Sequence, residues 1–146
     1  MKKSIRIRTP DDIIPVVKEW ENERQENFLV VTLNGKHDVI KVHHVSKGLV
    51  NETVAHPREC FYPAIKDNAV AVCFVHNHPS GDVRPSEEDK GVTDRLVLAS
   101  VILGFNVLDH IIISKNGWFS FKEEGLINSS PTKEEVSFYV NSLKNN

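Results

Sequence analysis

Cysteine is scarce in this sequence of 146 residues, which holds only Cys60 and Cys73, and the two do not form a Cys-x-x-Cys pair. A chain of this length can bury a hydrophobic core without disulfides. Cys73 lies inside the apolar run 69–75. We therefore expect both thiols to be reduced and buried, where cysteine behaves as a small hydrophobic side chain.

A long hydrophobic segment and a strong net charge are also missing. No apolar run reaches the roughly 18 to 20 residues of a membrane span, and the N-terminus lacks the apolar core of a signal peptide. We expect a cytoplasmic protein with no membrane association. The formal net charge is −2, so the chain as a whole does not attract nucleic acid. Its densest basic cluster is expected to be a solvated first strand or chain end, and consists of Lys2, Lys3, Arg6 and Arg8.

The composition is that of an ordinary folded domain, with 40% hydrophobic and 26% charged residues. The sequence contains no internal repeat and no low-complexity linker. A break at Ser129-Ser130-Pro131 precedes a last amphipathic segment. We therefore predict one domain over residues 1–128 and a C-terminal helical tail over 129–146, whose helix packs on the domain or binds a partner.

Hydrophobic periodicity and turn residues predict alternating helices and strands. Thr9 is expected to cap a first helix in which Pro10 is the first residue, and Gly104 is expected to end the longest helix. In chain order we expect a helix over 9–23, strands over 28–33 and 39–45, a helix over 56–68, a strand over 69–75, a helix over 86–103, strands over 107–113 and 118–121, and a helix from Thr132. This order predicts a single α/β domain in which helices flank a mixed sheet.

The most informative segment begins at the end of the apolar strand. His76 and His78 are two residues apart, so a strand points both side chains the same way, toward one ion. Asp89 lies one turn into the following helix, where a tight loop can bring its carboxylate back as a third ligand. Three nitrogen and oxygen ligands leave a position for water, as in catalytic zinc sites. We therefore predict a zinc site at His76, His78 and Asp89.

Simpler interpretations exist for the same residues. The two histidines are also consistent with satisfied polar residues at a strand end, and Ser86 with Asp89 is consistent with a capping box. Capping and metal binding are compatible, because Ser86 can cap the helix while its hydroxyl faces the metal site. The turn-rich segment 79–82, directly after the histidines, favours the metal site.

Three further histidines are assigned structural roles. His43 and His44 are adjacent, so they point to opposite faces of a strand and cannot share an ion. His56 lies near the start of a predicted helix.

The pattern His-x-His, seven residues, Ser, two residues, Asp, with an acidic residue well upstream, resembles the JAMM signature of the JAB/MPN metallopeptidases. Three segments resemble the RadC family in particular. They read His-Asn-His-Pro-Ser-Gly-Asp over 76–82, Ala-His-Pro-Arg-Glu over 55–59 and Val-Leu-Asp-His-Ile-Ile-Ile over 107–113. The resemblance covers residues 9–127, most of the chain.

This resemblance implies a three-layer α/β/α fold related to the cytidine deaminases, one Zn²⁺ per chain, and hydrolysis of an amide or isopeptide bond in a peptide or protein substrate. It also implies a general-base glutamate just before the first core strand, a position that Glu26 occupies. Glu26 would take a proton from metal-activated water and pass it to the leaving amine, while Ser86 would donate to the oxyanion or orient the water. The alternative for Glu26 is one more exposed acid, with Glu23 as the next candidate base.

The resemblance leaves other functions open. Some JAB/MPN-like domains have lost ligands and act as non-catalytic scaffolds, although every ligand is present here. Zinc-dependent deamination requires a Cys-x-x-Cys motif, which this chain lacks. RadC-like proteins usually carry an N-terminal helix-hairpin-helix region, whereas this chain begins almost directly at the metallopeptidase-like domain. We expect only non-specific DNA binding, and a role as a DNA-repair or mobile-DNA accessory protein rests on the family association alone.

Overall fold

The computed structural model describes residues 3–51, 54–128 and 131–144. Lys2, the predicted break at Ser129-Ser130 and the end of the predicted tail lie outside the described residues. Five strands form one mixed sheet in the order β2-β1-β3-β4-β5. They are β1 (Asn27–Leu33), β2 (Val39–Lys47), β3 (Ala71–Asn77), β4 (Asn106–Ser114) and β5 (Gly117–Ser120). The β3/β4 pair is parallel, and the other pairs are antiparallel.

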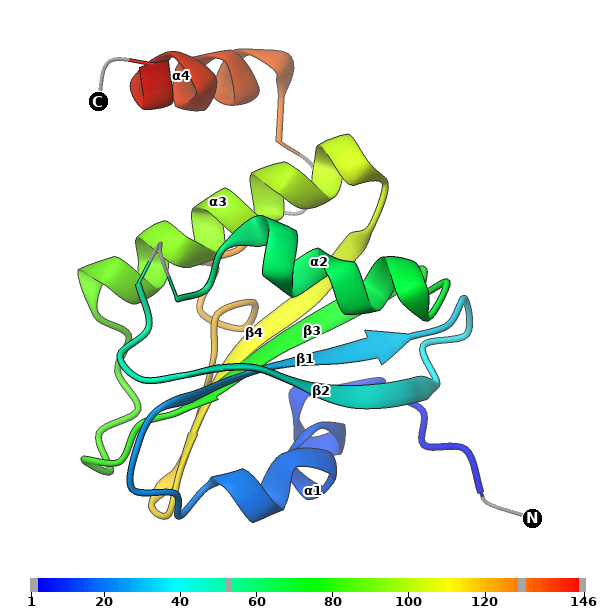
Figure 1. The fold of residues 1–146 in the computed structure, drawn as a ribbon, viewed down its shortest axis with the longest axis vertical. Coiled ribbons are helices and arrows are strands. Elements are labelled where there is room, and N and C mark those ends of the chain that lie inside the picture. The colour runs from blue at the N-terminus through cyan, green and yellow to red at the C-terminus, as the bar shows by residue number, and fades with distance from the viewer. Residues whose placement is uncertain (1–2, 52–53, 129–130, 145–146) are drawn as a thin grey trace.

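Helices cover both faces of this sheet (Figure 1). Helices α2 (Pro57–Lys66) and α3 (Glu87–Leu103) lie on one face, and the N-terminal helical segment that contains α1 (Ile14–Val17) lies on the other. Helix α4 (Lys133–Lys144) lies beyond α3, and the two helices line a shared hollow. The α/β architecture with a mixed sheet between helices is the predicted one.

The central strands β1 and β3 are buried along their whole length, because helices cover both faces of the sheet. Successive residues of a strand point to opposite faces and therefore enter two different cores. On the side of α2 and α3, Phe28 and Phe74 belong to one core; on the side of α1, Leu29 and Val75 belong to the other. The pairing of these two strands is the rigid centre of the domain.

The prediction of one continuous helix over 9–23 is wrong. The segment contains a 3-10 turn over Pro10–Asp12, helix α1 and a second 3-10 turn over Lys18–Trp20. Asp12 accepts hydrogen bonds from the backbone N–H groups of Arg8 and Thr9, which closes the first turn. Pro15 has no N–H to continue a helical hydrogen-bond ladder, so a new helix starts beside it. The apolar spacing nevertheless places Ile13 and Val17 in the core, as expected.

The apolar strand predicted over 69–75 is shifted by two residues. It runs over Ala71–Asn77, because Asn68 takes a left-handed turn conformation with φ 54° before it. At its other end, His76 and Asn77 still pair in register with Ile112 and Ile113 of β4. The strand therefore includes the first of the two predicted histidine ligands rather than stopping before it.

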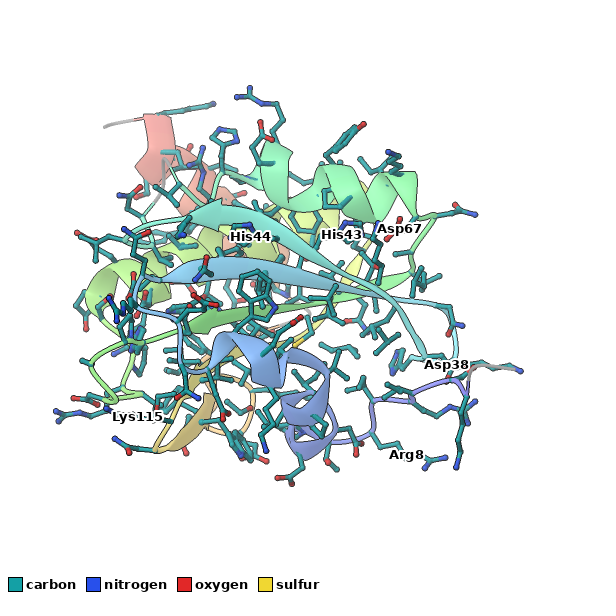
Figure 2. All side chains as sticks on the ribbon, turned by 60° about the horizontal axis from the view of Figure 1, so that its bottom comes forward. Arg8, Asp38, His43, His44, Asp67 and Lys115 are labelled. Atoms are coloured by element: carbon teal, nitrogen blue, oxygen red, sulfur yellow. The ribbon has the colours of Figure 1, made fainter. Side chains whose placement is uncertain are left out.

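The histidines with predicted structural roles have partners other than His76 and His78. His43 contacts the carboxylate of Asp67 at the end of α2 (Figure 2). His44 lies on the opposite face of β2, where its ring stacks on Trp20 at a centroid distance of 5.0 Å. His56 caps α2 by accepting the N–H of Arg58.

The two cysteines are reduced and fully buried, as expected. Burial raises the pKa of the Cys60 thiol to about 12 and raises the pKa of the Cys73 thiol well above its ordinary value. Both thiols are therefore neutral packing groups. Among the described residues, none of the helices combines the length and apolar character needed to cross a bilayer.

Two glycines of α3 provide a matched test of its boundaries. Gly104 caps the helix in the left-handed region at φ 86°, whereas Gly91 lies inside the helix with open space where a Cβ would stand. We expect Gly104→Ala to lower the free energy of unfolding by about 1–2 kcal/mol, and Gly91→Ala to raise it by about 0.5–1 kcal/mol. Urea denaturation of both variants measures the two effects. Equal shifts in one direction would contradict the assigned end of the helix.

Candidate metal centre

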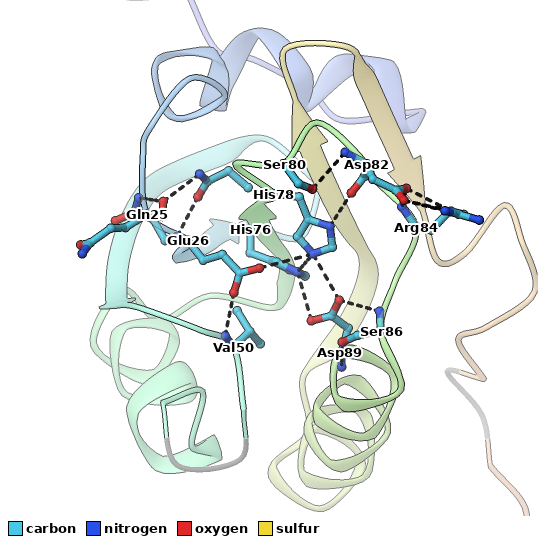
Figure 3. Close-up of polar contacts among 12 residues, drawn as sticks. Gln25, Glu26, Val50, His76, His78, Ser80, Asp82, Arg84, Ser86 and Asp89 are labelled. Carbon is cyan, nitrogen blue, oxygen red and sulfur yellow. Dashed lines mark hydrogen bonds and ion pairs between the residues drawn. The ribbon is translucent and has the colours of Figure 1, made fainter.

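The side chains of His76 and His78 converge at the end of β3, with their Nε2 atoms 3.0 Å apart (Figure 3). His76 is the penultimate residue of the strand, and His78 follows the strand directly. The side chain of His76 is fully buried and that of His78 is 11% exposed. One ring is thus set in the core while the other borders solvent.

The ring nitrogen of His78 that faces away from the site fixes its tautomer. Nδ1 lies 2.7 Å from the backbone carbonyl of Asp82, and a carbonyl can only accept, so Nδ1 carries the proton. The turn that presents this carbonyl includes Gly81, which has φ 89° and donates its N–H to the carbonyl of His78. Nε2 of His78 is left as a lone pair directed into the site.

Asp89 approaches the histidine pair from the first turn of α3. Its Oδ1 lies 3.3 Å from Nε2 of His76, and its Oδ2 lies 3.2 Å from Nε2 of His78. The predicted capping box is also present, because the Ser86 N–H donates to Oδ2 at 2.8 Å and the Asp89 N–H donates to Oγ of Ser86 at 3.0 Å. The two interpretations of Asp89 are therefore compatible in one geometry.

Glu26 reaches the same point from the segment before β1. Its Oε1 lies 3.6 Å from Nε2 of His78, while its Oε2 accepts the backbone N–H of Val50 at 2.9 Å. The buried side chain of Asn77 holds this segment in place, since it accepts the Asn27 N–H and donates to the carbonyl of Gln25. Ligand atoms of Glu26, His76 and His78 lie within 4.8 Å of one another.

The donor set fits a divalent cation such as Zn²⁺. Lone pairs and carboxylate oxygens of Glu26, His76, His78 and Asp89 face one another, and this arrangement is unfavourable without a cation or a proton among them. Burial alone would raise the pKa of Asp89, but its close contacts with the rings of His76 and His78 hold it well below its ordinary range. Burial alone would lower the pKa of His78, but the Asp89 carboxylate raises it. Both shifts indicate a site that attracts positive charge.

A cleft of about 710 Å³ opens onto this cluster. Its walls come from two loops: residues 48–50 on one side and 79–86 on the other. Leu49, 76% exposed, lines the first loop, and an ion pair between Arg84 and Asp82 lies on the second. The candidate metal cluster therefore faces an open groove that can admit part of a larger molecule.

Sequence reasoning missed two buried polar residues that extend the cluster inward. His110 of β4 is fully buried, and its Nε2 lies 2.8 Å from Nδ1 of His76. Its other nitrogen contacts Oγ1 of Thr93 in α3. Burial lowers the pKa of His110 well below its ordinary value, so the ring is neutral. The available signal was the polar pair Asp109-His110 between the apolar residues of β4.

Comparison with known proteins identifies the family of this chain. The family model described as the RadC-like JAB domain matches residues 7–126. The chain belongs to this family. RadC-like relatives include a "UPF0758 protein" of Trichlorobacter lovleyi, 50% identical over 109 residues, which cover 75% of this chain and 47% of that protein. Another, from Alkaliphilus metalliredigens, is 46% identical over 123 residues, which cover 84% of this chain and 53% of the relative.

The chain thus spans about half the length of the curated RadC-like relatives it matches. The segment that the family model matches, residues 7–126, contains the whole sheet and each residue of the candidate metal cluster. The candidate centre therefore lies within the RadC-like JAB domain.

We expect about one Zn²⁺ per chain after reconstitution, because the four groups converge on one point. His78→Ala removes a ligand without opening the core and should reduce zinc content to background. His43→Gln, which alters a histidine paired with Asp67 instead, should keep the full content. Elemental analysis of the purified proteins measures both. Equal zinc in the wild type and His78→Ala would show that the ligands lie elsewhere.

Proposed function

We propose that this domain is a zinc-dependent metallopeptidase that hydrolyses an amide or isopeptide bond in a peptide or protein substrate. The observation that carries the proposal is the convergence of His76, His78 and Asp89 with a second carboxylate, Glu26, at the floor of an open cleft. Structural zinc sites are closed by four protein ligands, whereas hydrolytic sites combine three with a nearby base.

His76, His78 and Asp89 are the groups that would hold the ion. A zinc ion bound there supplies a Lewis acid for the substrate carbonyl and lowers the pKa of water toward about 7. His76 comes from the end of β3 and Asp89 from the start of α3, so the sheet and α3 set their positions, while His78 follows β3 directly.

Glu26 is suited to act as the general base because its two oxygens have different partners. The N–H of Val50 anchors Oε2, so Oε1 remains directed at the histidine pair. A carboxylate held in this way can take a proton from water at the cleft floor and return it to the leaving amine. The same anchor ties the base to loop 48–50 of the cleft wall.

Ser86 is suited to donate a hydrogen bond. Its Oγ accepts the Asp89 N–H as a helix cap, and this bond uses a lone pair and leaves the hydroxyl proton free for another acceptor. Ser86 lines the same cleft. It can therefore stabilise negative charge that develops on a substrate carbonyl oxygen, a contribution of about 3 kcal/mol in known oxyanion holes.

Glu26→Gln tests the proposed chemistry without removing a ligand. The amide keeps the size and can still accept the Val50 N–H, but it cannot take a proton. We expect unchanged zinc content and thermal stability, and hydrolysis lower by roughly 10² to 10⁴. The measurement uses the member of a panel of peptide and isopeptide-linked reporters that the zinc-loaded wild type cleaves fastest.

Glu23→Gln is the matched control, because Glu23 is an exposed acid three residues earlier in the same segment. It should retain wild-type turnover. If Glu23→Gln loses activity while Glu26→Gln retains it, the base is Glu23. If the zinc-loaded wild type cleaves none of the panel, the result favours a zinc-binding scaffold over a peptidase.

Ser86→Asn separates capping from catalysis. Asparagine is as good an N-cap as serine, so the free energy of unfolding should change by only a few tenths of a kcal/mol. Turnover should fall by roughly 10² because the hydroxyl donor is lost. Urea denaturation and the reporter assay measure the two effects on one sample. Wild-type turnover in this variant would leave Ser86 with the capping role alone.

A further inference from the structure

We propose that His110 and Thr93 are positioning residues that fix the tautomer of His76 and join it to the helix carrying Asp89. The inference rests on the proposed metal function of His76, although its geometry extends away from the cleft into the core. A continuous chain of hydrogen-bonding contacts runs from the His76 ring through His110 and Thr93 to the backbone carbonyl of Asp89.

The direction of each hydrogen bond follows from the far end of this chain. A carbonyl only accepts, so the Thr93 hydroxyl donates its one proton to the carbonyl of Asp89, at 2.8 Å. Oγ1 of Thr93 must then accept from His110, which places the proton of the neutral His110 ring on Nδ1. Nε2 of His110 is therefore an acceptor, and it receives the Nδ1 proton of His76. Nε2 of His76 is left with a lone pair directed into the metal site.

Aromatic rings surround His110 and favour its neutral form. Phe121 stacks on the imidazole at a centroid distance of 4.6 Å, while Phe28 and Phe74 approach it edge-on at 5.6 and 6.2 Å. A protonated ring would have to give up its hydration in this apolar enclosure. A neutral ring with both nitrogens bonded has no such cost. The enclosure thus selects the proton arrangement that leaves His76 able to bind a metal.

A β-bulge in β4 directs the His110 side chain into this aromatic enclosure. In the β3/β4 pair, Val72 lies opposite Val107 but the next residue, Cys73, lies opposite Asp109, so β4 contains one extra residue. The extra residue changes which face the following side chains enter. Asp109 consequently faces the α1 side, where it accepts the hydroxyl of Ser120, and His110 faces α3 and the metal cluster. Without the bulge the two side chains would exchange faces.

The two histidine ligands are held in different ways. His78 donates to the Asp82 carbonyl in an exposed loop, whereas His76 donates to a buried ring whose own partner belongs to α3. The second arrangement couples the strand ligand to the helix ligand through the core. Partners of this kind behind a metal-binding histidine typically change metal affinity 10- to 100-fold when they are removed.

The wild-type tautomer is tested first, in the metal-free protein. Two-bond ¹H–¹⁵N correlation spectra at about pH 8, where an ordinary imidazole is neutral, distinguish Nδ1–H from Nε2–H for the assigned ring of His76. We expect the Nδ1–H form. The Nε2–H form in the wild type would overturn the proposal whether or not the protein hydrolyses any substrate.

His110→Phe keeps an aromatic ring in the enclosure and removes both nitrogens. We expect His76 to lose its preference for Nδ1–H, and zinc affinity in competition with a chromophoric chelator to fall 10- to 100-fold. His110→Gln places an amide oxygen near the position of Nε2 and should restore much of both. Wild-type tautomer and wild-type affinity in His110→Phe would overturn the proposal.

Thr93 provides a pair of substitutions that leaves both histidines in place. Thr93→Val is isosteric and removes the hydroxyl, while Thr93→Ser keeps the hydroxyl and loses the methyl group. We expect the valine variant to shift the His76 tautomer and weaken zinc binding, and the serine variant to match the wild type in both. This pair decides the question if His110→Phe does not fold. Identical tautomers and affinities in the two Thr93 variants would mean that Thr93 only packs.

The readouts separate this proposal from the proposed function. Loss of hydrolysis alone in any variant would be consistent with a purely structural role, so activity is not used. If the wild type binds zinc and shows the expected tautomer but cleaves nothing, the peptidase proposal fails while the positioning role stands. If the wild type shows the other tautomer but cleaves a reporter, the positioning role fails while the peptidase proposal stands.

Discussion

Two imidazole nitrogens held 3.0 Å apart, with carboxylates on either side, are the constraint on which the rest of this structure depends. Like-signed partial charges at such distances repel, and the protein holds them together at the floor of a cleft, where the side chains are at most 15% exposed. A cation resolves the conflict. The surrounding strands and helix hold the imidazole nitrogens and carboxylates together despite their mutual repulsion.

Strands β1 and β3 and helix α3 together hold these groups in place. The antiparallel register of β1 and β3 places Phe28 opposite His76, so the residues just before β1 lie beside the end of β3, and Glu26 reaches His78. Helix α3 supplies Asp89, whose carboxylate both caps the helix and faces the histidines. Because one side chain serves the helix start and the cluster, an ion bound there also stabilises the first turn of α3.

The sequence by itself determined most of the elements and the residues of the cluster, because these depend on local patterns. Alternation and apolar runs located the strands, and Gly104 marked the end of α3. The spacing of His76, His78 and Asp89 follows from a strand end, a tight turn and the first turn of a helix, each a short-range geometry. Glu26 was found differently, through a family resemblance, because it is fifty residues away from His76 along the chain.

Only the tertiary structure decided what depends on pairing between distant segments. The bulge that turns His110 toward His76 exists only where β4 pairs with β3, and period-two alternation along β4 gives no sign of it. Likewise, β3 continues to Asn77 because β4 offers partners that far, and the first helix breaks where Pro15 interrupts its ladder while the core still buries Ile13. Local sequence patterns therefore identified the candidate ligands, and long-range strand pairing decided how the buried side of the site holds them.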